Sequence, residues 1–358
     1  MFKVRMVPAG YGDCLWIEYG QEKKPFRILI DAGTLPTYKD VRKLVEKELN
    51  PSDRRFDLFI VSHIDTDHID AAVKLLNSPS LKLQYGQIWF NGWKQLVDKD
   101  LLGPQQGEYL TAMIERDGIQ LNKAVKGRAV YVPDKGKLPR LKLPGGMVLT
   151  VLSPGAAQLQ LLRQEWKKAM GKMAGNAKAA LKKLAVTGKY KDVLGPAKLP
   201  DIDKLADAPT KLDTSPSNGS SIVVLAEFEG KKCLFAADSH PDVLEKSIDR
   251  FLANTGSKQL QVDAFKVPHH GSKYNNPVSL IKKLNCRMYL VSTNGKIFHH
   301  PDPESIARII KYGGPQPKLY FNYGTDRTML WDNTDLKRKH RYEVNIRPNS
   351  DPALDILL

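Results

Sequence analysis

The chain has 358 residues, of which 42% are hydrophobic, and it carries a formal net charge of +16 at pH 7. This length accommodates one large or two ordinary domains, and this hydrophobic content excludes a disordered chain. No stretch of about 18 apolar residues occurs, and the N-terminal residues lack an apolar run of signal length, so we expect no transmembrane segment. The positive charge favours anionic partners such as nucleic acid, nucleotides, phospholipid headgroups or phosphorylated polymers.

The cysteines indicate the redox environment. Cys14, Cys233 and Cys286 lie far apart in the chain, and no two of them form a CxxC pair. This spacing predicts neither a disulfide framework nor a thiolate metal site. A reducing, cytoplasmic location fits this pattern best.

The first half of the chain reads as strands separated by turn signals at Gly10 and Gly12. A helix is expected at 37–49, and a shorter one at 71–76. The expected strands are 3–8, 14–19, 26–31, 57–62, 87–91, 128–132 and 147–152.

A second set of elements follows with a similar order. Its expected strands are 221–228, 232–237, 262–267, 288–292 and 318–322, and its expected helices are 241–253, 277–284 and 303–312. The sequence therefore predicts a mixed α/β protein with a first half at 1–155, an insertion at 156–217 and a second half at 218–358.

The insertion is strongly basic. Residues 156–198 contain ten Lys or Arg against Glu165 and Asp192, which is +8 of the total charge. Apolar residues recur at steps of three and four from Leu159 to Leu184 and predict an amphipathic helix with lysines, including Lys167 and Lys168, on its other face. This helix could pack on the body with a solvated lysine face, or bind nucleic acid, a protein partner, a second copy or a membrane. Residues 192–217 are expected to form a linker or lid.

The most informative motif is SHIDTDHID, from Ser62 to Asp70. The apolar run before it predicts a buried strand that delivers its side chains onto a loop, where active sites are common. Imidazole and carboxylate are the ligands that hold zinc, manganese or iron(II) without thiolate. His63, Asp65 and Asp67 can converge on one side of an extended loop, and Asp67 with His68 could serve a second ion.

Two further strand ends carry similar chemistry. The apolar run 234–237 ends on Asp238, which we interpret either as a metal ligand or as the N-cap of the following helix. The expected strand 262–267 is followed by His269 and His270, and adjacent histidines at a strand end favour metal binding or acid–base chemistry.

Together these segments resemble the metallo-β-lactamase superfamily, and within it the soluble hydrolase domain of ComEC-type DNA-uptake proteins and their stand-alone relatives. The resemblance covers most of 1–330 outside the insertion. The similar segments are GYGDC at 10–14, ILIDAG at 28–33, SHIDTDHID at 62–70, the strand led by Asn218, Ala237-Asp238, the HHGS of 269–272, Ser292-Thr293-Asn294 and His300-Pro301. The superfamily's usual HxHxDH has Asp65 at its middle histidine here, its third histidine is replaced by Asn218, and the glycine of its Gly-Asp pair is Ala237.

The resemblance implies a four-layer αββα sandwich and a two-metal site, with zinc favoured over manganese or iron. Asp67, His68 and one histidine of the 269/270 pair would hold one ion, and His63 with Asp65 the other. Asp238 would bridge them. His270, which precedes glycine, is favoured as the ligand.

The resemblance also implies the remaining roles. Asp67, His269 and His300 are the candidate catalytic residues, and Asp31 would orient a ligand imidazole. Asn218 and Ser272 would contact substrate, and Ser272 and the amides that follow it would bind a phosphate oxygen if a helix begins there. Lys167 and Lys168 would contact a polyanion.

These features favour a metal-dependent phosphodiesterase or nuclease. Two ions about 3.5–4 Å apart would lower the pKa of a bridging water and provide a hydroxide for in-line displacement at phosphorus. Nucleic acid or a nucleotide is the expected substrate, steered by the basic insertion. The alternatives are a hydrolase of thioesters, lactones or β-lactams with the same fold, and a non-catalytic binding or assembly protein that uses the helix 159–184 as a partner or homodimer surface.

Overall fold

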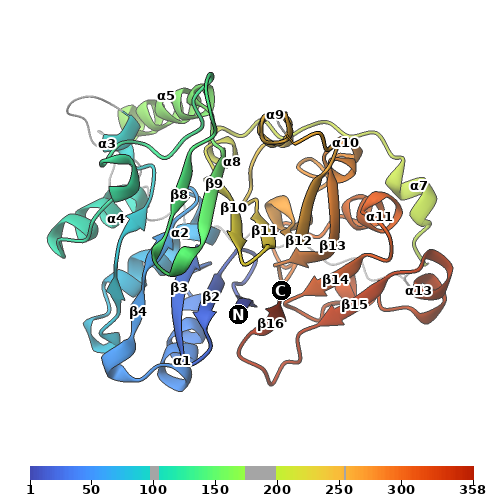
Figure 1. The fold of residues 1–358 in the computed structure, drawn as a ribbon, viewed down its shortest axis with the longest axis horizontal. Helices are drawn as coiled ribbons and strands as arrows, with labels where there is room; N and C mark the ends of the chain where they lie inside the picture. The colour runs from blue at the N-terminus through green and yellow to red at the C-terminus, as the bar shows by residue number, and fades with distance from the viewer. Residues whose placement is uncertain (97–104, 174–198, 254) are drawn as a thin grey trace.

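The computed structural model describes residues 1–96, 105–173, 199–253 and 255–358 (Figure 1). One sheet has six strands in the order β16-β1-β2-β3-β5-β7, and β4 pairs separately with β6. These strands are β1 (Phe2–Met6), β2 (Leu15–Gln21), β3 (Lys24–Ile30), β4 (Arg55–Phe56), β5 (Leu58–Ile60), β6 (Gln84–Tyr85), β7 (Ile88–Trp89) and β16 (Leu354–Leu357).

The other sheet has eight strands in the order β15-β14-β13-β12-β11-β10-β9-β8. They are β8 (Arg140–Lys142), β9 (Val148–Ser153), β10 (Val223–Phe228), β11 (Lys231–Phe235), β12 (Leu260–Lys266), β13 (Leu284–Val291), β14 (Lys318–Phe321) and β15 (Glu343–Ile346). Strands β11 to β15 run parallel to one another, so the segments after their carboxyl ends emerge at one edge of the sheet.

Helices lie on the outer side of each sheet. The helices are α1 (Thr37–Glu48), α2 (Thr66–Leu76), α3 (Trp93–Leu96), α4 (Gln105–Arg116), α5 (Ala156–Met173), α7 (Ile202–Ala206), α8 (Pro216–Gly219), α9 (Pro241–Leu252), α10 (Val278–Lys282), α11 (Pro303–Tyr312), α12 (Asp326–Met329) and α13 (Thr334–His340). The 3₁₀ turns are η1 (Pro51–Asp53), η2 (Pro79–Leu81), η3 (Lys123–Val125), η4 (Pro144–Gly146) and η5 (Pro268–Gly271).

Three hydrophobic cores define the layers. One lies between the sheets, because it joins Val4 and Ile17 of the six-stranded sheet to Val151 and Phe235 of the eight-stranded sheet. A second joins the outer face of the six-stranded sheet to α1, α2, α4 and α5. The third joins the outer face of the eight-stranded sheet to α7, α9, α10 and α11. The order is helix, sheet, sheet, helix, which confirms the expected αββα sandwich.

The alternation of side chains along a strand explains this arrangement. In β2, Leu15, Ile17 and Tyr19 face the core between the sheets, whereas Trp16 faces the helices. Successive side chains of a strand point to opposite faces, so a strand covered on both sides is apolar throughout.

The two chain ends pair with each other at one edge of the six-stranded sheet. Strand β16 pairs antiparallel with β1, and Figure 1 shows the two termini side by side. No strand was expected at 354–357, at 140–142 or at 343–346. Strands β8 and β9, although early in the chain, belong to the sheet of the later strands, and β16 returns to the sheet of the earlier ones.

Two expectations about the first half are wrong. Residues 128–132 form no strand, and the only pairing within them is a bridge between Val132 and Gly155. The amide of Asn91 instead exchanges two hydrogen bonds with the backbone of Val130, taking the place of a strand ladder. Helix α2 begins at Thr66 rather than at residue 71. Asp65 occupies its N-cap position without a side-chain cap hydrogen bond, and the acidic Asp67 in its first turn favours a helix start there.

The described part of the insertion includes α5. Leu159, Leu162 and Trp166 are buried as the periodicity predicts, and Lys167 and Lys168 are exposed. The rest of the expected helix, from residue 174, lies outside the described residues. Helix α5 contacts α3 and α8, so its described part packs on the body of the protein.

The last part of the insertion is held in place by one buried arginine. Arg308 of α11 donates hydrogen bonds to the carbonyls of Ala206 and Ala208 and to the hydroxyl of Thr210. It also donates to the carbonyls of Lys273 and Asn276, in the loop after the HHGS motif. The expected linker or lid is therefore fixed against that loop within its described residues.

We expect Arg308→Met to lower the free energy of unfolding by about 3 kcal/mol, because buried carbonyls lose charged donors and stay out of reach of water. Urea unfolding would measure the change. Arg338→Met, at an exposed arginine of α13, is the matched control and should change it by less than about 0.5 kcal/mol. Equal effects of the two substitutions would refute a clamping role for Arg308.

Among the described residues, no helix has both the length and the apolar character needed to cross a membrane.

Candidate metal centre

The SHIDTDHID motif lies where β5 ends. His63 lies three residues after the last residue of the strand, and Asp67 and His68 lie in the first turn of α2. From the other sheet, Asp238 follows β11 and His270 lies in η5, just after β12. The site therefore forms where the carboxyl ends of strands from both sheets meet.

Four buried side chains form the centre of the site: Asp67, His68, Asp238 and His270. Their ligand atoms all lie within 4.8 Å of one another. Asp238 Oδ2 is 3.3 Å from His68 Nε2 and 3.4 Å from His270 Nε2. Asp67 Oδ2 is 3.3 Å from His270 Nε2. Two carboxylates and two imidazoles suit a divalent ion such as zinc, manganese or iron(II).

The outer nitrogen of each histidine is already engaged. His68 Nδ1 lies 2.8 Å from Asp31 Oδ2, and His270 Nδ1 lies 2.9 Å from the carbonyl of Ser292. His63 Nδ1 lies 2.9 Å from Ser62 Oγ, which itself donates to Asp31 Oδ2. These contacts place the proton of each neutral ring on Nδ1 and leave Nε2 as a lone-pair donor toward the centre.

Two buried atoms at the centre have no hydrogen-bond partner. They are His63 Nε2 and Asp238 Oδ1, in side chains that are almost fully inaccessible to water. Leaving buried polar atoms unpaired is costly in a folded protein. A cation that accepts their lone pairs would remove this cost, so the residues present fit a metal ion.

Electrostatics agree with this fit. Burial disfavours the charged imidazoles of His68 and His270, but Asp238 faces both rings and raises the pKa of each well above its ordinary value. Burial would raise the pKa of Asp238, yet the two imidazoles hold it well below the usual range. The carboxylates therefore favour positive charge at this point, and a divalent cation bound to the neutral rings would supply it in place of ring protons.

The predicted ligands of a second ion are less closely gathered. His63 Nε2 lies 3.5 Å from Asp65 Oδ2 and 3.9 Å from Asp238 Oδ2. The Asp65 side chain is 39% exposed and accepts a hydrogen bond from Ser217 Oγ. Neither residue belongs to the clusters found among the described residues. Here Asp238 is the carboxylate that both sets share.

The two histidines of the HHGS motif differ in position. His270 lies inside the four-residue cluster. His269 Nε2 is 3.7 Å from Asp238 Oδ2, and its Nδ1 is 2.8 Å from Asn275 Oδ1 and 3.5 Å from Asp213 Oδ2. His269 therefore lies at the rim of the cluster, with 23% of its side chain exposed.

Asn218 is close to this rim but does not point its amide at the cluster. Its Nδ2 donates to Asp213 Oδ2 at 2.7 Å and lies 3.4 Å from His269 Nδ1. Asp213 also accepts hydrogen bonds from Asn275 and from the backbone of Ser215. No sequence signal identified Asp213, because it stands alone in a stretch that read as a linker.

The other predicted residues are spread around the site. The His300 ring lies 5.3 Å from that of His269, and His300 Nδ1 is 3.7 Å from Asp302 Oδ2. Ser272 is buried and accepts a hydrogen bond from the backbone of Tyr274. The next helix begins only at Val278. The expected helix N-terminus after Ser272, which would have bound a phosphate oxygen, is therefore absent. Lys167 and Lys168 are exposed on α5 and form no hydrogen bond or ion pair with the residues of the cluster.

The glycine segment packs directly against the ligand helix. A Cβ on Gly12 would lie 1.7 Å from the carbonyl oxygen of Asp67, so only glycine fits there. Next to it, Asp13 forms a fully buried ion pair with Lys266, and its other oxygen lies 3.3 Å from His270 Nδ1. Sequence reasoning missed Lys266, although a lysine at the end of an apolar strand was a usable signal.

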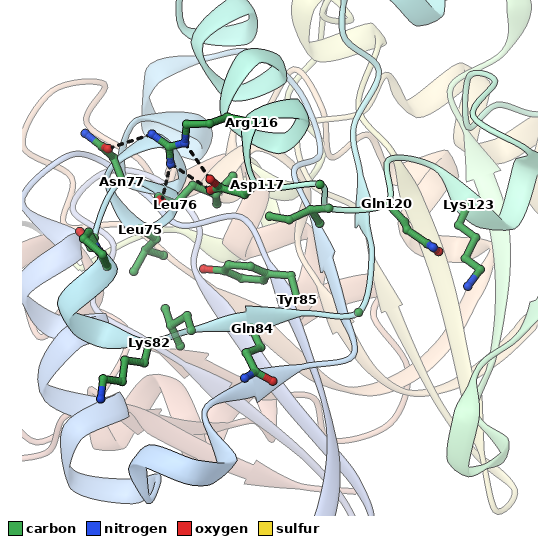
Figure 2. Close-up of a pocket in the computed structure, with 16 residues that line it drawn as sticks. Leu75, Leu76, Asn77, Lys82, Gln84, Tyr85, Arg116, Asp117, Gln120 and Lys123 are labelled. Atoms are coloured by element: carbon green, nitrogen blue, oxygen red, sulfur yellow. Dashed lines mark hydrogen bonds and ion pairs between the residues drawn. The ribbon is translucent and has the colours of Figure 1, made fainter.

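A hollow lies away from this cluster. It has a volume of about 780 Å³ and opens between the C-terminal end of α2 and the chain that follows α4 (Figure 2). There Arg116 is bonded to Asp117 and to the carbonyl of Leu76, so its charge is already compensated. Asp67 and His68 lie at the opposite end of α2, and this hollow has no part in the metal centre.

No family model matches the chain, and no curated protein matches it. Among solved structures, a mutant of CmlA beta-hydroxylase is similar with a TM-score of 0.40 and 12% identity, over 100% of this chain and 54% of that one. The metallo-beta-lactamase fold protein YhfI from Bacillus subtilis is similar with a TM-score of 0.41 and 13% identity, over 99% and 98% of the two chains. This chain thus spans about half of the CmlA chain. Likenesses this distant say nothing about residues or reaction.

Proposed function

We propose that this protein is a metal-dependent phosphodiesterase that acts on nucleic acid or a nucleotide. The observation that carries the proposal is the buried cluster of Asp67, His68, Asp238 and His270, whose ligand atoms all lie within 4.8 Å of one another while the Nδ1 atoms of both rings are bonded outside it. The net charge of +16 favours a phosphate ester over a neutral amide or lactone. We also propose that the protein is related to the hydrolase domain of ComEC-type proteins, because it contains the motifs HxDxDH and HHGS.

The four clustered side chains would hold one ion, and His63 and Asp65 would hold a second, with Asp238 shared. Such ions, zinc by preference, supply Lewis acidity and activate water for attack on phosphorus. Asp31 keeps His68 and, through Ser62, His63 in the tautomer that binds metal.

Residues at the rim would handle the substrate. His269 lies next to Asp238 and is held by Asn275 and Asp213, so its ring is oriented toward the reacting group. His300 adjoins His269 and extends this edge outward. Asn218 would contact a phosphate oxygen, and Lys167 and Lys168 of the proposed insertion 156–217 would attract the polyanion.

We expect the purified protein to hydrolyse bis-p-nitrophenyl phosphate and single-stranded DNA, and His63→Ala to reduce both rates by at least about 10²-fold. His340→Ala, on α13 and outside the cluster, is the matched control and should leave the rates unchanged. The same preparations are assayed on thioester, lactone and β-lactam substrates. Turnover confined to those substrates would overturn the proposal, as would tightly bound metal without any turnover, which a binding or assembly protein would show.

A further inference from the structure

An exposed aromatic surface borders the metal centre. Phe298 lies on the turn between β13 and α11 with 54% of its surface exposed, and its neighbour Ile297 is 38% exposed. Single exposed apolar side chains are ordinary on protein surfaces. Two adjacent exposed apolar side chains beside a buried polar site form a patch, and such patches often bind a ligand.

This patch continues inward as a series of ring contacts. The Phe298 ring lies 6.3 Å from that of His300, nearly parallel to it at 27°. The His300 ring lies 5.3 Å from His269, and the His269 ring lies 5.8 Å from His270. An unbroken path of rings therefore leads from the surface to a proposed metal ligand.

A second ring supports the outer end of this path. Tyr11, from the glycine segment, meets Phe298 edge to face, with ring centroids 5.5 Å apart. This contact fixes one edge of the Phe298 ring and leaves much of the ring exposed. Offset and edge contacts of this kind orient aromatic rings.

The turn that carries Phe298 is pinned to the same glycine segment. The backbone of Asn294 donates to the carbonyl of Gly10, and the backbone of Lys296 donates to the side chain of Asn294. The backbone of Gly10 in turn donates to the Tyr323 hydroxyl. Because the platform is held in place before a ligand arrives, stacking on it costs little ordering entropy.

We propose that Phe298, supported by Tyr11 and flanked by the exposed Lys296, stacks a nucleobase of the substrate next to the scissile phosphate. This inference rests on the proposed phosphodiesterase function and names its substrate class: a base-bearing, single-stranded polynucleotide or nucleotide. Aromatic rings beside cationic side chains are the usual platform for unpaired bases, whereas a paired duplex hides its base faces. Lys296 lies on the same turn and provides a positive charge for the adjoining phosphate.

The test compares two single-stranded oligomers of equal length and charge, one of thymidine and one of abasic sugar. Affinity is measured by fluorescence anisotropy on phosphorothioate versions, which resist hydrolysis, and kcat/KM on the ordinary diesters. We expect Phe298→Ala to weaken binding of the thymidine oligomer about 5- to 100-fold and to change binding of the abasic oligomer less than about twofold. Phe298→Trp should retain or improve the affinity.

Tyr131→Ala is the matched control, since it removes an exposed ring that lies outside the path described above. It should leave both affinities unchanged. A dinucleotide of thymidine distinguishes a nucleotide from a strand as the ligand. If Phe298→Ala weakens binding of the dinucleotide as much as binding of the oligomer, the ligand is a nucleotide. If it weakens binding of the oligomer only, the ligand is a strand.

Equal affinity for the two oligomers, or equal losses on both in Phe298→Ala, would overturn the stacking platform. Failure of the proposed function looks different. If neither oligomer is hydrolysed but binding still depends on the base and on Phe298, the platform stands and phosphodiester hydrolysis falls. If both oligomers are hydrolysed with equal kcat/KM and Phe298→Ala has no effect, hydrolysis stands and the platform falls.

Discussion

We expect Asp238→Asn to remove bound metal and to lower hydrolysis by at least about 10³-fold. Among the described residues, Asp238 is the one carboxylate that lies within 4 Å of His63, His68 and His270 alike, so its charge would hold both proposed ion positions together. Asparagine keeps the shape of the side chain but loses that charge. Metal content is measured by elemental analysis after dialysis, and activity on bis-p-nitrophenyl phosphate.

The matched control is Asp242→Asn, four residues further along in α9. The Asp242 side chain is half exposed and forms only a loose pair with Lys246 at 3.9 Å. The Asp242→Asn variant should bind as much metal as the unsubstituted protein and be equally active. If Asp238→Asn retains the same metal content, the cluster is not the metal site.

Lys266→Met is expected to lower the free energy of unfolding by about 3–5 kcal/mol, because it leaves a buried carboxylate without its counter-charge. Lys266 and Asp13 are both fully buried and bonded to each other. Burial would raise the pKa of Asp13, and Lys266, followed by His270, holds it below its usual range instead. Methionine has nearly the same length, so the loss reports charge rather than volume.

A double-mutant cycle separates charge from packing. Adding Asp13→Asn to Lys266→Met should recover part of the lost stability, since neither buried charge then remains. Lys231→Met, which breaks an exposed pair with Asp263, is the control and should cost less than about 1 kcal/mol. Chemical denaturation measures all four variants, and additive losses from Lys266→Met and Asp13→Asn would contradict the coupling.

The chemistry of the site could be predicted largely from local sequence. His63, Asp67 and His68 were recognisable because an apolar strand ends directly before them, and Asp238 and His270 follow other strands in the same way. Residue type and the alternation of apolar positions are properties of short segments. They can therefore be recognised in the sequence without knowledge of the tertiary contacts.

The start of α2 shows the limit of this reasoning at short range. SHIDTDHID read as an extended loop, with His63, Asp65 and Asp67 on one side. In the structure Asp65 is the residue before a helix, so Asp67 and His68 reach the cluster from its first turn, whereas the Asp65 side chain bonds to Ser217 and is 39% exposed. A short segment of this kind is not a stable helix by itself, and packing of α2 on the sheet decides the outcome.

The sequence by itself determined the residue types of a metal site, the αββα class and the basic excess around residues 156–198. Only the tertiary structure decided that His270 rather than His269 enters the cluster, that Lys266 compensates Asp13, and that Asp213 holds His269. These pairs are separated by tens to hundreds of residues along the chain. Their distances depend on how two sheets and the segment held by Arg308 pack together, and no local pattern encodes that geometry.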